Sequence, residues 1–116
     1  MSFAIVRALS QAAPRSAVST AAQVSVGVAA GQILAADANR KGLLITNTGT
    51  TTLYLVLGSG TPTTTVYHVV LRPCTAANDG QGGAYIDDSW VGAVQAVGSG
   101  AGGTLVILEF TEAQTQ

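Results

Sequence analysis

Residues 32–58, QILAADANRKGLLITNTGTTTLYLVLG, constrain the fold of this chain more than any other stretch. Two short apolar runs, 42–47 and 52–57, flank a polar Asn-Thr-Gly-Thr sequence. The Asn47 side chain can hydrogen-bond within an Asx turn, and Gly49 is available for a positive φ. The pattern predicts a β-hairpin of two short strands and contains no catalytic or metal-binding set of residues.

The rest of the chain repeats this pattern of short apolar runs separated by Gly, Asn, Thr and Pro. The runs recur at intervals of about 8 to 14 residues, the spacing of an all-β sandwich or barrel. We therefore predict an all-β fold, an antiparallel β-sandwich that is jelly-roll-like and has about eight short strands. The predicted strands are 24–29, 32–35, 42–47, 52–57, 66–71, 84–86, 90–97 and 104–111.

The N-terminal residues differ in composition from the remainder. They contain Arg7 and Arg15, no acidic residue and many Ala and Ser, which is typical of transit peptides and of flexible arms. Fully extended, such a segment reaches about 70 Å, against about 30 Å for the diameter of the remaining globule. We divide the chain into an extended N-terminal arm (1–23), a β-sandwich domain (24–112) and a C-terminal tail (113–116). The arm is expected to cross onto a neighbouring subunit; the alternative is an additional edge strand or short helix on its own domain.

Few charges are available to keep copies of this chain apart. Only 9% of the residues are charged and 47% are apolar, with a net charge of -1 and a mean hydropathy of +0.40. We expect a homo-oligomer, a dimer or trimer, with much of the surface covered by partners. Five cations against six acids provide no basic stripe for nucleic acid. No apolar run approaches the roughly 20 residues that cross a bilayer, so we expect a soluble protein with no membrane partner.

Two of the predicted strands carry apolar residues on both faces. In 53–57 and 105–108, side chains pointing to either side are apolar, whereas a strand with one wet face should alternate. We expect one face to meet the opposite sheet and the other to be covered by the arm or by another subunit. The alternative is a pair of central strands with small apolar residues exposed.

The residue types used in catalysis and metal binding are sparse. His68 lies within an apolar run, and Cys74, the lone cysteine, follows Pro73 in a loop. A hydrolase would need these two side chains within hydrogen-bonding reach of each other and a third group to orient them. Oxygen ligands for a hard cation are offered by Asp87 and Asp88, with Asp79 and Asn78 upstream, but the calcium-loop spacing is absent. A solvated turn before Trp90 is the alternative. We predict no catalytic, metal or cofactor site, and no enzymatic activity.

The aromatic residues suggest a second kind of site. One aromatic residue per strand more often anchors a core, but stacking on a sugar is the alternative for these residues: Trp90, Tyr85, Tyr54, Tyr67 and Phe110. The GSGAGG sequence at 98–103 leads into a predicted strand, whereas a phosphate-binding loop opens a helix. Glycan binding therefore stays open at this point, and phosphate binding is not expected.

The order of the strand sequences is itself distinctive. IL-x-A precedes an Asn-Arg pair and L-x-I-x-N, followed by LY, G-x-V-x-A and a final E-x-T. This order resembles that of a group of small virion proteins of tailed bacteriophages, although Asp37 stands where Asn is more usual. The matching residues lie between 32 and 112 of the 116: Ile33, Leu34, Ala36, Asn39, Arg40, Leu43, Ile45, Asn47, Leu53, Tyr54, Gly58, Gly92, Val94, Ala96, Val97, Glu109 and Thr111.

The resemblance implies a structural role in the virion. It implies a capsid decoration or cement protein that binds the major capsid protein on the capsid exterior, or else a tail or fibre module that binds host-surface glycan. The arm lies outside the resemblance and is where we expect attachment to the partner. Arg40 and Lys41 precede a strand and are candidates for contact with an acidic patch; a solvated bend is the alternative. The predicted partner-binding residues are Phe3, Ile5, Arg7, Arg15, Arg40 and Lys41.

Overall fold

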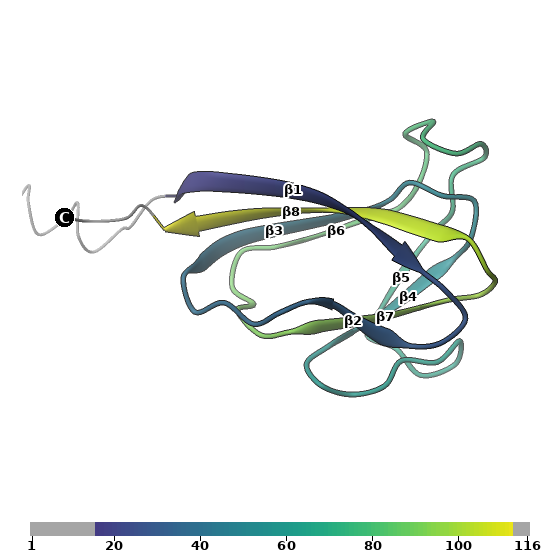
Figure 1. The fold of residues 1–116 in the computed structure, drawn as a ribbon, viewed down its shortest axis with the longest axis horizontal. Helices are drawn as coiled ribbons and strands as arrows, with labels where there is room; N and C mark the ends of the chain where they lie inside the picture. The colour runs from purple at the N-terminus through teal and green to yellow at the C-terminus, as the bar shows by residue number, and fades with distance from the viewer. Residues whose placement is uncertain (1–15, 113–116) are drawn as a thin grey trace, which may run out of the picture.

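The computed structural model describes residues 16–112, with side chains described from 19 to 111. This part of the chain forms two four-stranded antiparallel sheets stacked face to face (Figure 1), so the all-β sandwich prediction is confirmed. The strands are β1 (Ser16–Val26), β2 (Gly31–Leu34), β3 (Arg40–Asn47), β4 (Leu53–Leu57), β5 (Val69–Leu71), β6 (Ala84–Asp87), β7 (Val94–Gly98) and β8 (Gly103–Glu112).

The strand order is that of a jelly roll. One sheet has the order β1-β8-β3-β6 and the other β2-β7-β4-β5. The first strand pairs with the last, and β2 with β7, β3 with β6 and β4 with β5, all antiparallel. The chain is therefore one long folded ribbon wound into two sheets.

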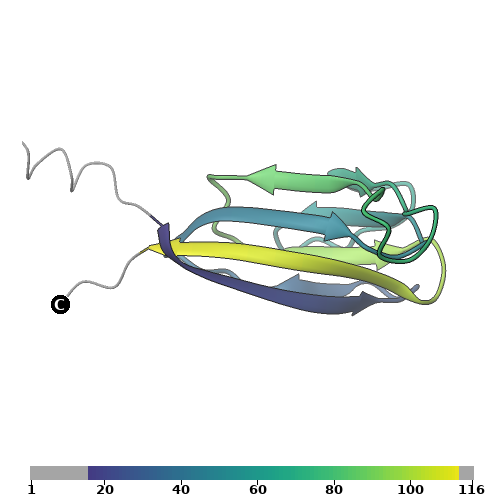
Figure 2. The same cartoon turned by 90° about the horizontal axis from the view of Figure 1, so that it is seen from above.

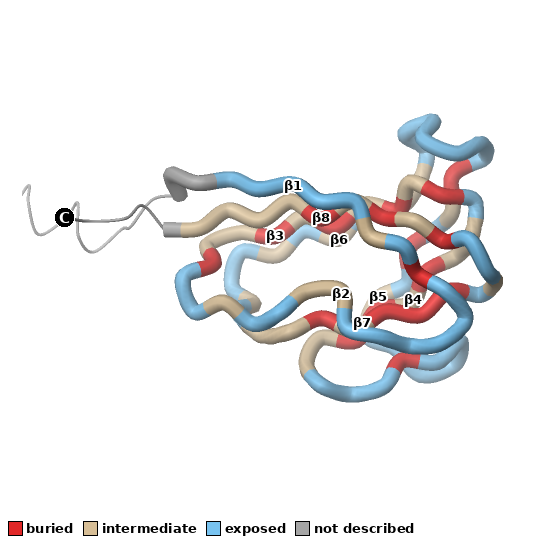
Figure 3. The backbone as a smooth tube through the Cα atoms, in the orientation of Figure 1, coloured by how far each residue is buried: buried red, intermediate tan, exposed pale blue. Residues whose placement is uncertain are grey.

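The core lies between the sheets and follows the two-residue period of the strands. Leu43 and Ile45 of β3 face Leu53 and Leu55 of β4, and all four side chains are almost fully buried. Leu105 of β8 is also inaccessible to solvent. Figure 3 shows the buried backbone concentrated along these central strands, while β1 is exposed over much of its length.

The predicted hairpin over residues 32–58 is wrong in one respect, because β3 and β4 belong to opposite sheets. The Asx turn is present: the Gly49 N–H donates to Asn47 Oδ1 over 3.0 Å. The Asn47 amide also donates to the carbonyls of Thr51 and Leu71, so the buried side chain fastens a corner between sheets. Gly49 has no positive φ; a Cβ there would lie 2.9 Å from Thr104 Oγ1. Turn chemistry alone does not separate a hairpin from such a corner.

The boundary between the predicted arm and domain also changes. Strand β1 begins at Ser16 and pairs with β8 through Val26, so residues 16–23 belong to the sheet. The alternative of an additional edge strand on the same domain holds for this part of the predicted arm. Residues 1–15 and the predicted C-terminal tail, 113–116, lie outside the described residues.

Other predicted strand ends move by a few residues. The strand predicted over 66–71 contains only Val69–Leu71, and that predicted over 90–97 is Val94–Gly98. In both cases the omitted N-terminal residues lie in loops with their own hydrogen bonds: the Val66 N–H donates to Thr63 Oγ1, and the Trp90 N–H donates to Asp87 Oδ1. Side-chain acceptors in these loops compete with strand pairing.

Candidate interaction surface

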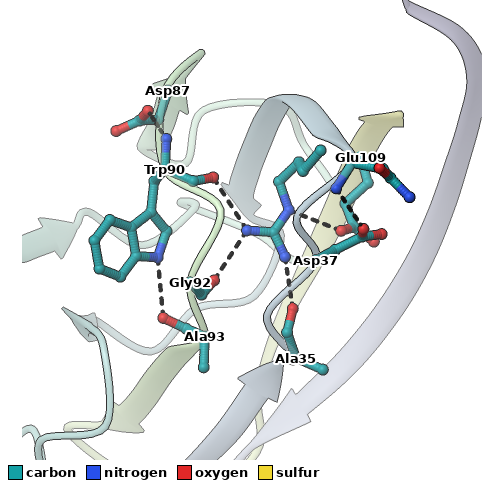
Figure 4. Close-up of polar contacts among 9 residues, drawn as sticks. Ala35, Asp37, Asp87, Trp90, Gly92, Ala93 and Glu109 are labelled. Carbon is teal, nitrogen blue, oxygen red and sulfur yellow. Dashed lines mark hydrogen bonds and ion pairs between the residues drawn. The ribbon is translucent and has the colours of Figure 1, made fainter. Parts of the chain in front are cut away.

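Arg40 is a structural residue, which corrects its assignment to a partner interface. Only 3% of it is exposed, and its Nε donates to Glu109 Oε2 over 2.8 Å. Its terminal nitrogens donate to the carbonyls of Trp90, Gly92 and Ala35 at 3.1, 2.9 and 2.6 Å. Figure 4 shows these acceptors surrounding the guanidinium. The group therefore ties β3 and β8 to the β2–β3 and β6–β7 connections.

A β-bulge turns Arg40 inward. The register between β3 and β8 shifts between Arg40 and Gly42, so Lys41 is the additional residue and the strict alternation is broken. Without the shift, strict alternation would turn Lys41, two positions before Leu43, toward the core and would turn Arg40 outward. The sequence does contain a clue to this ion pair. Glu109 follows the core residue Leu105 by four positions, which places both on the inward face of the strand, where the carboxylate needs a cation.

The other predicted contact residues are not tested by the structure. Lys41 is partly exposed at the bulge, and its assignment to a partner interface stays a prediction. Phe3, Ile5, Arg7 and Arg15 lie outside the described residues.

The outer face of the β1-β8-β3-β6 sheet is wide and uncharged. The strand registers align Ala21, Leu108, Leu44 and Ile86 in one row across all four strands. Ile86 is 76% exposed, and Leu44 and Leu108 are partly exposed. Figure 2 looks onto this face, and no described segment lies across its middle. The neighbouring rows are also uncharged, and consist of Gln23, Val106, Thr46 and Ala84, and of Ser19, Phe110 and Gly42.

We name these three rows the outer sheet face. With strands about 4.8 Å apart and a rise of about 3.4 Å per residue, the face covers roughly 400 Å². That is comparable with the largest apolar patches of monomeric proteins, many of which are interaction sites. The prediction that β8 needs a covering layer on its outward side therefore applies here.

The other sheet is covered by a loop of the same chain. Val56 and Val97 lie on its outer side yet are only 7% and 5% exposed. The 58–68 connection buries Pro62, and the ring of Tyr67 packs at 5.0 Å from that of Tyr54 on β4. The second layer expected over β4 is thus this loop.

His68 and Cys74 are bound to different partners. The His68 Nδ1 accepts the Leu57 N–H over 3.0 Å, and the Cys74 thiol donates to the Asn47 carbonyl over 3.4 Å. One residue precedes β5 and the other follows it, so an extended strand holds them apart. The contact that a Cys/His hydrolase requires is not made.

The Asp87 carboxylate organises the turn before Trp90. It accepts hydrogen bonds from the Tyr85 hydroxyl, from the Ser89 N–H and hydroxyl, and from the Trp90 N–H. The Tyr85 bond and then the Ser89 backbone bond lower the pKa of Asp87 to about 2. Burial, followed by the bond to Asp87, raises the pKa of Tyr85 to about 12. Both groups are therefore engaged within the turn.

Trp90 is packed inward. Its indole N–H donates to the Ala93 carbonyl over 3.0 Å (Figure 4), and its ring contacts the core cluster. A Cβ on Gly92 would lie 2.5 Å from the ring, so one ring face rests on this glycine. Trp90 and Tyr85 are both partly buried against the core, and sugar stacking by either ring stays a prediction.

The remaining acidic residues do not converge. Across residues 16–112, no group of three or more His, Cys, Asp or Glu side chains is placed to hold a metal ion. Asp79 instead accepts the Ala76 and Gln81 N–H groups, which lowers the pKa of its carboxyl. The same part of the chain has no helix with the length and hydropathy needed to cross a bilayer.

No protein-family model and no curated protein matches the chain. Among solved structures, it is similar to a chain of the disulfide-linked pili that form Bacillus endospore appendages, with 15% identity over 83% of this chain and 87% of that chain and a TM-score of 0.44. It is also similar to dTDP-4-dehydrorhamnose 3,5-epimerase from Bacillus anthracis, with 11% identity over 97% of this chain and 61% of that chain and a TM-score of 0.45. At these values neither likeness transfers an activity or an assembly to this chain.

Proposed function

We propose that this chain is a non-enzymatic structural protein of a tailed-bacteriophage virion, a capsid decoration protein that binds the major capsid protein on the shell exterior. The observation that carries the proposal is the outer sheet face, which is four strands wide, contains no charged residue and is left uncovered by the described chain. The sequence resemblance over residues 32–112 supports the choice of a virion protein.

The chemistry of this face suits a permanent contact. Burial of apolar surface stabilises an interface by about 25 cal/mol per Å², and an uncharged face incurs no penalty for desolvating ions. Ile86 lies at the edge of the row and is the most exposed large apolar residue in the described part of the chain. It is therefore the residue whose change most directly tests the contact.

The test is co-sedimentation with shells assembled from the virion's major capsid protein. Ile86→Lys places a charge on the outer sheet face and is expected to weaken shell binding at least tenfold. Val28→Lys is the matched control, because Val28 is a 67% exposed branched residue in the β1–β2 connection. Equal binding by Ile86→Lys and the wild type would refute the role of this face.

A second variant tests the predicted contribution of the N-terminal residues. Deletion of residues 1–15 leaves β1 intact, because β1 begins at Ser16. Loss of shell binding with an unchanged circular dichroism spectrum would support attachment through Phe3, Ile5, Arg7 or Arg15. Full binding by the deletion variant would confine the contact to the sandwich.

The alternative function is a tail or fibre module that binds host glycan, with Trp90 and Tyr85 as its candidate stacking residues. Trp90 rests on Gly92 and bonds to Ala93, and the Tyr85 hydroxyl bonds to Asp87. No feature of these residues favours sugar binding over their role in the fold. A virion image with this protein labelled would distinguish shell from tail directly.

A further inference from the structure

Strand β1 forms a free sheet edge unlike the other edges of the described sandwich. Its neighbour on one side is β8, and no strand of residues 16–112 lies on its other side. It has 11 residues, SAVSTAAQVSV, with no charged residue and no proline. From Ser19 to Gln23 every residue is exposed. An edge of this length and composition has unpaired backbone N–H and C=O groups available for another strand.

The other three edges carry features that oppose pairing. Strand β2 has 4 residues and a register shift, and β5 has 3 residues and is followed by the exposed Arg72. Strand β6 has 4 residues and ends in Asp87, with Asp88 next. Short strands, bulges and charges are the usual protection of sheet edges. Only β1 lacks all three over its regular section.

We propose that β1 pairs with β1 of a second copy of this chain, antiparallel and about a twofold axis, to form a continuous eight-stranded sheet. The pairing of β1 with β8 is regular from Val18 to Val26, after a shift next to Ser16, and the midpoint of this section is Ala22. Centred there, Ser19 lies opposite Ser25 of the second copy and Thr20 opposite Val24. Ala22 then faces its own copy and Ala21 lies opposite Gln23, so no bulky pair and no like charges are opposed.

The second copy is favoured as the occupant because the edge is complementary to itself. An uncharged strand of small residues pairs with an identical strand without electrostatic or steric conflict, and the twofold arrangement repeats every contact. The paired sheet also joins the outer sheet faces of the two copies into one surface. The inference stands apart from the proposed function, since it concerns the free protein and requires no capsid.

The size of the contact sets its strength. A paired section of nine residues is about 30 Å long, and a sheet about 10 Å thick gives roughly 600 Å² over both copies. Interfaces below about 1,200 Å² belong to weak or transient associations. The dimer is therefore expected to dissociate on dilution, and its mass should approach twice 11.6 kDa only at high concentration.

The test is sedimentation equilibrium of the full chain without shells. Ala22→Lys places two ammonium groups opposite each other at the axis, and should raise the dimer dissociation constant about tenfold or more. Ala22→Glu should have the same effect, whereas an equimolar mixture of the two variants should restore dimers by pairing opposite charges. Ala101→Lys is the matched control, because Ala101 is an exposed alanine in the β7–β8 turn.

Hydrogen exchange provides a measurement that needs no variant. Raising the concentration of the wild type should protect alternate backbone amides between Ser19 and Ser25. A wild type that is monomeric throughout overturns the proposal. Protection of these amides in the monomer also overturns the proposal, because it would assign the edge to residues 1–15. Protection that arises only when shells are added overturns it as well. Dimers abolished by Ile86→Lys but unaffected by Ala22→Lys would instead place the contact on the outer sheet face.

Discussion

Replacing Arg40 with methionine should destabilise the sandwich severely. The substitution keeps much of the volume but removes every donor to Glu109 and to the carbonyls of Ala35, Trp90 and Gly92. The Glu109 side chain, 19% exposed, then retains a charge with little solvent and no cation. Removal of one partner from a buried ion pair costs about 3–5 kcal/mol, and each carbonyl left without a donor adds to that loss.

The magnitude is large relative to the whole stability. A domain of this size has a free energy of unfolding of about 5–15 kcal/mol, so a loss of about 4 kcal/mol removes a quarter or more of it. With a urea dependence of about 2 kcal/mol per molar, the unfolding midpoint should fall by about 2 M. Urea denaturation followed by circular dichroism measures this shift.

Two further variants separate geometry from charge. Arg40→Lys keeps the cation but not the planar fork that reaches four acceptors, so it should recover less than half of the lost stability. Arg72→Met is the matched control, because Arg72 is exposed and its loss should move the midpoint by less than about 0.5 M. An Arg40→Met midpoint within the same 0.5 M of wild type would refute the structural role assigned to this arginine.

Three other perturbations test the corner and the turns. Asn47→Ala, which removes all three side-chain bonds at the buried corner, should cost about 3 kcal/mol in urea denaturation. Gly82→Ala should destabilise the fold by about 2 kcal/mol or prevent folding, because the new Cβ would lie 1.9 Å from a backbone oxygen. Gly100→Ala is the control and should be nearly neutral, because no atom lies within 4 Å of its Cβ position. The carboxyl of Asp87, with a pKa of about 2 against 3.8, stabilises the fold above about pH 4, and this contribution should disappear as the pH falls toward 2. Thermal unfolding of Asp87→Asn should lose part of that pH dependence. The pKa of the Tyr85 hydroxyl is raised from 10.0 to about 12, so its pH dependence has the opposite sign. Its contribution to stability should be present below about pH 10 and lost as the pH rises toward 12.

The candidate contact residues were the least predictable part of the chain. Arg40 looked partner-facing because a cation before a strand is usually solvated, and a one-residue bulge reversed its direction. The predicted arm includes residues 16–23 because the inward positions of β1 that precede Val24 and have described side chains, Thr20 and Ala22, are small. Small residues weaken the two-residue hydrophobic period on which strand prediction depends.

Local sequence is enough to predict the all-β character, the approximate positions of most strands, the Asx turn at Asn47 and the low charge. These properties depend on neighbours in the chain, through alternation and turn chemistry. Only the tertiary structure places β3 and β4 in opposite sheets, joins Arg40 to Glu109, and leaves one sheet face and the β1 edge uncovered by the rest of the described chain. Each of these depends on pairing between residues far apart in sequence, such as Ala22 with Ile107, and no local pattern encodes that choice of partner.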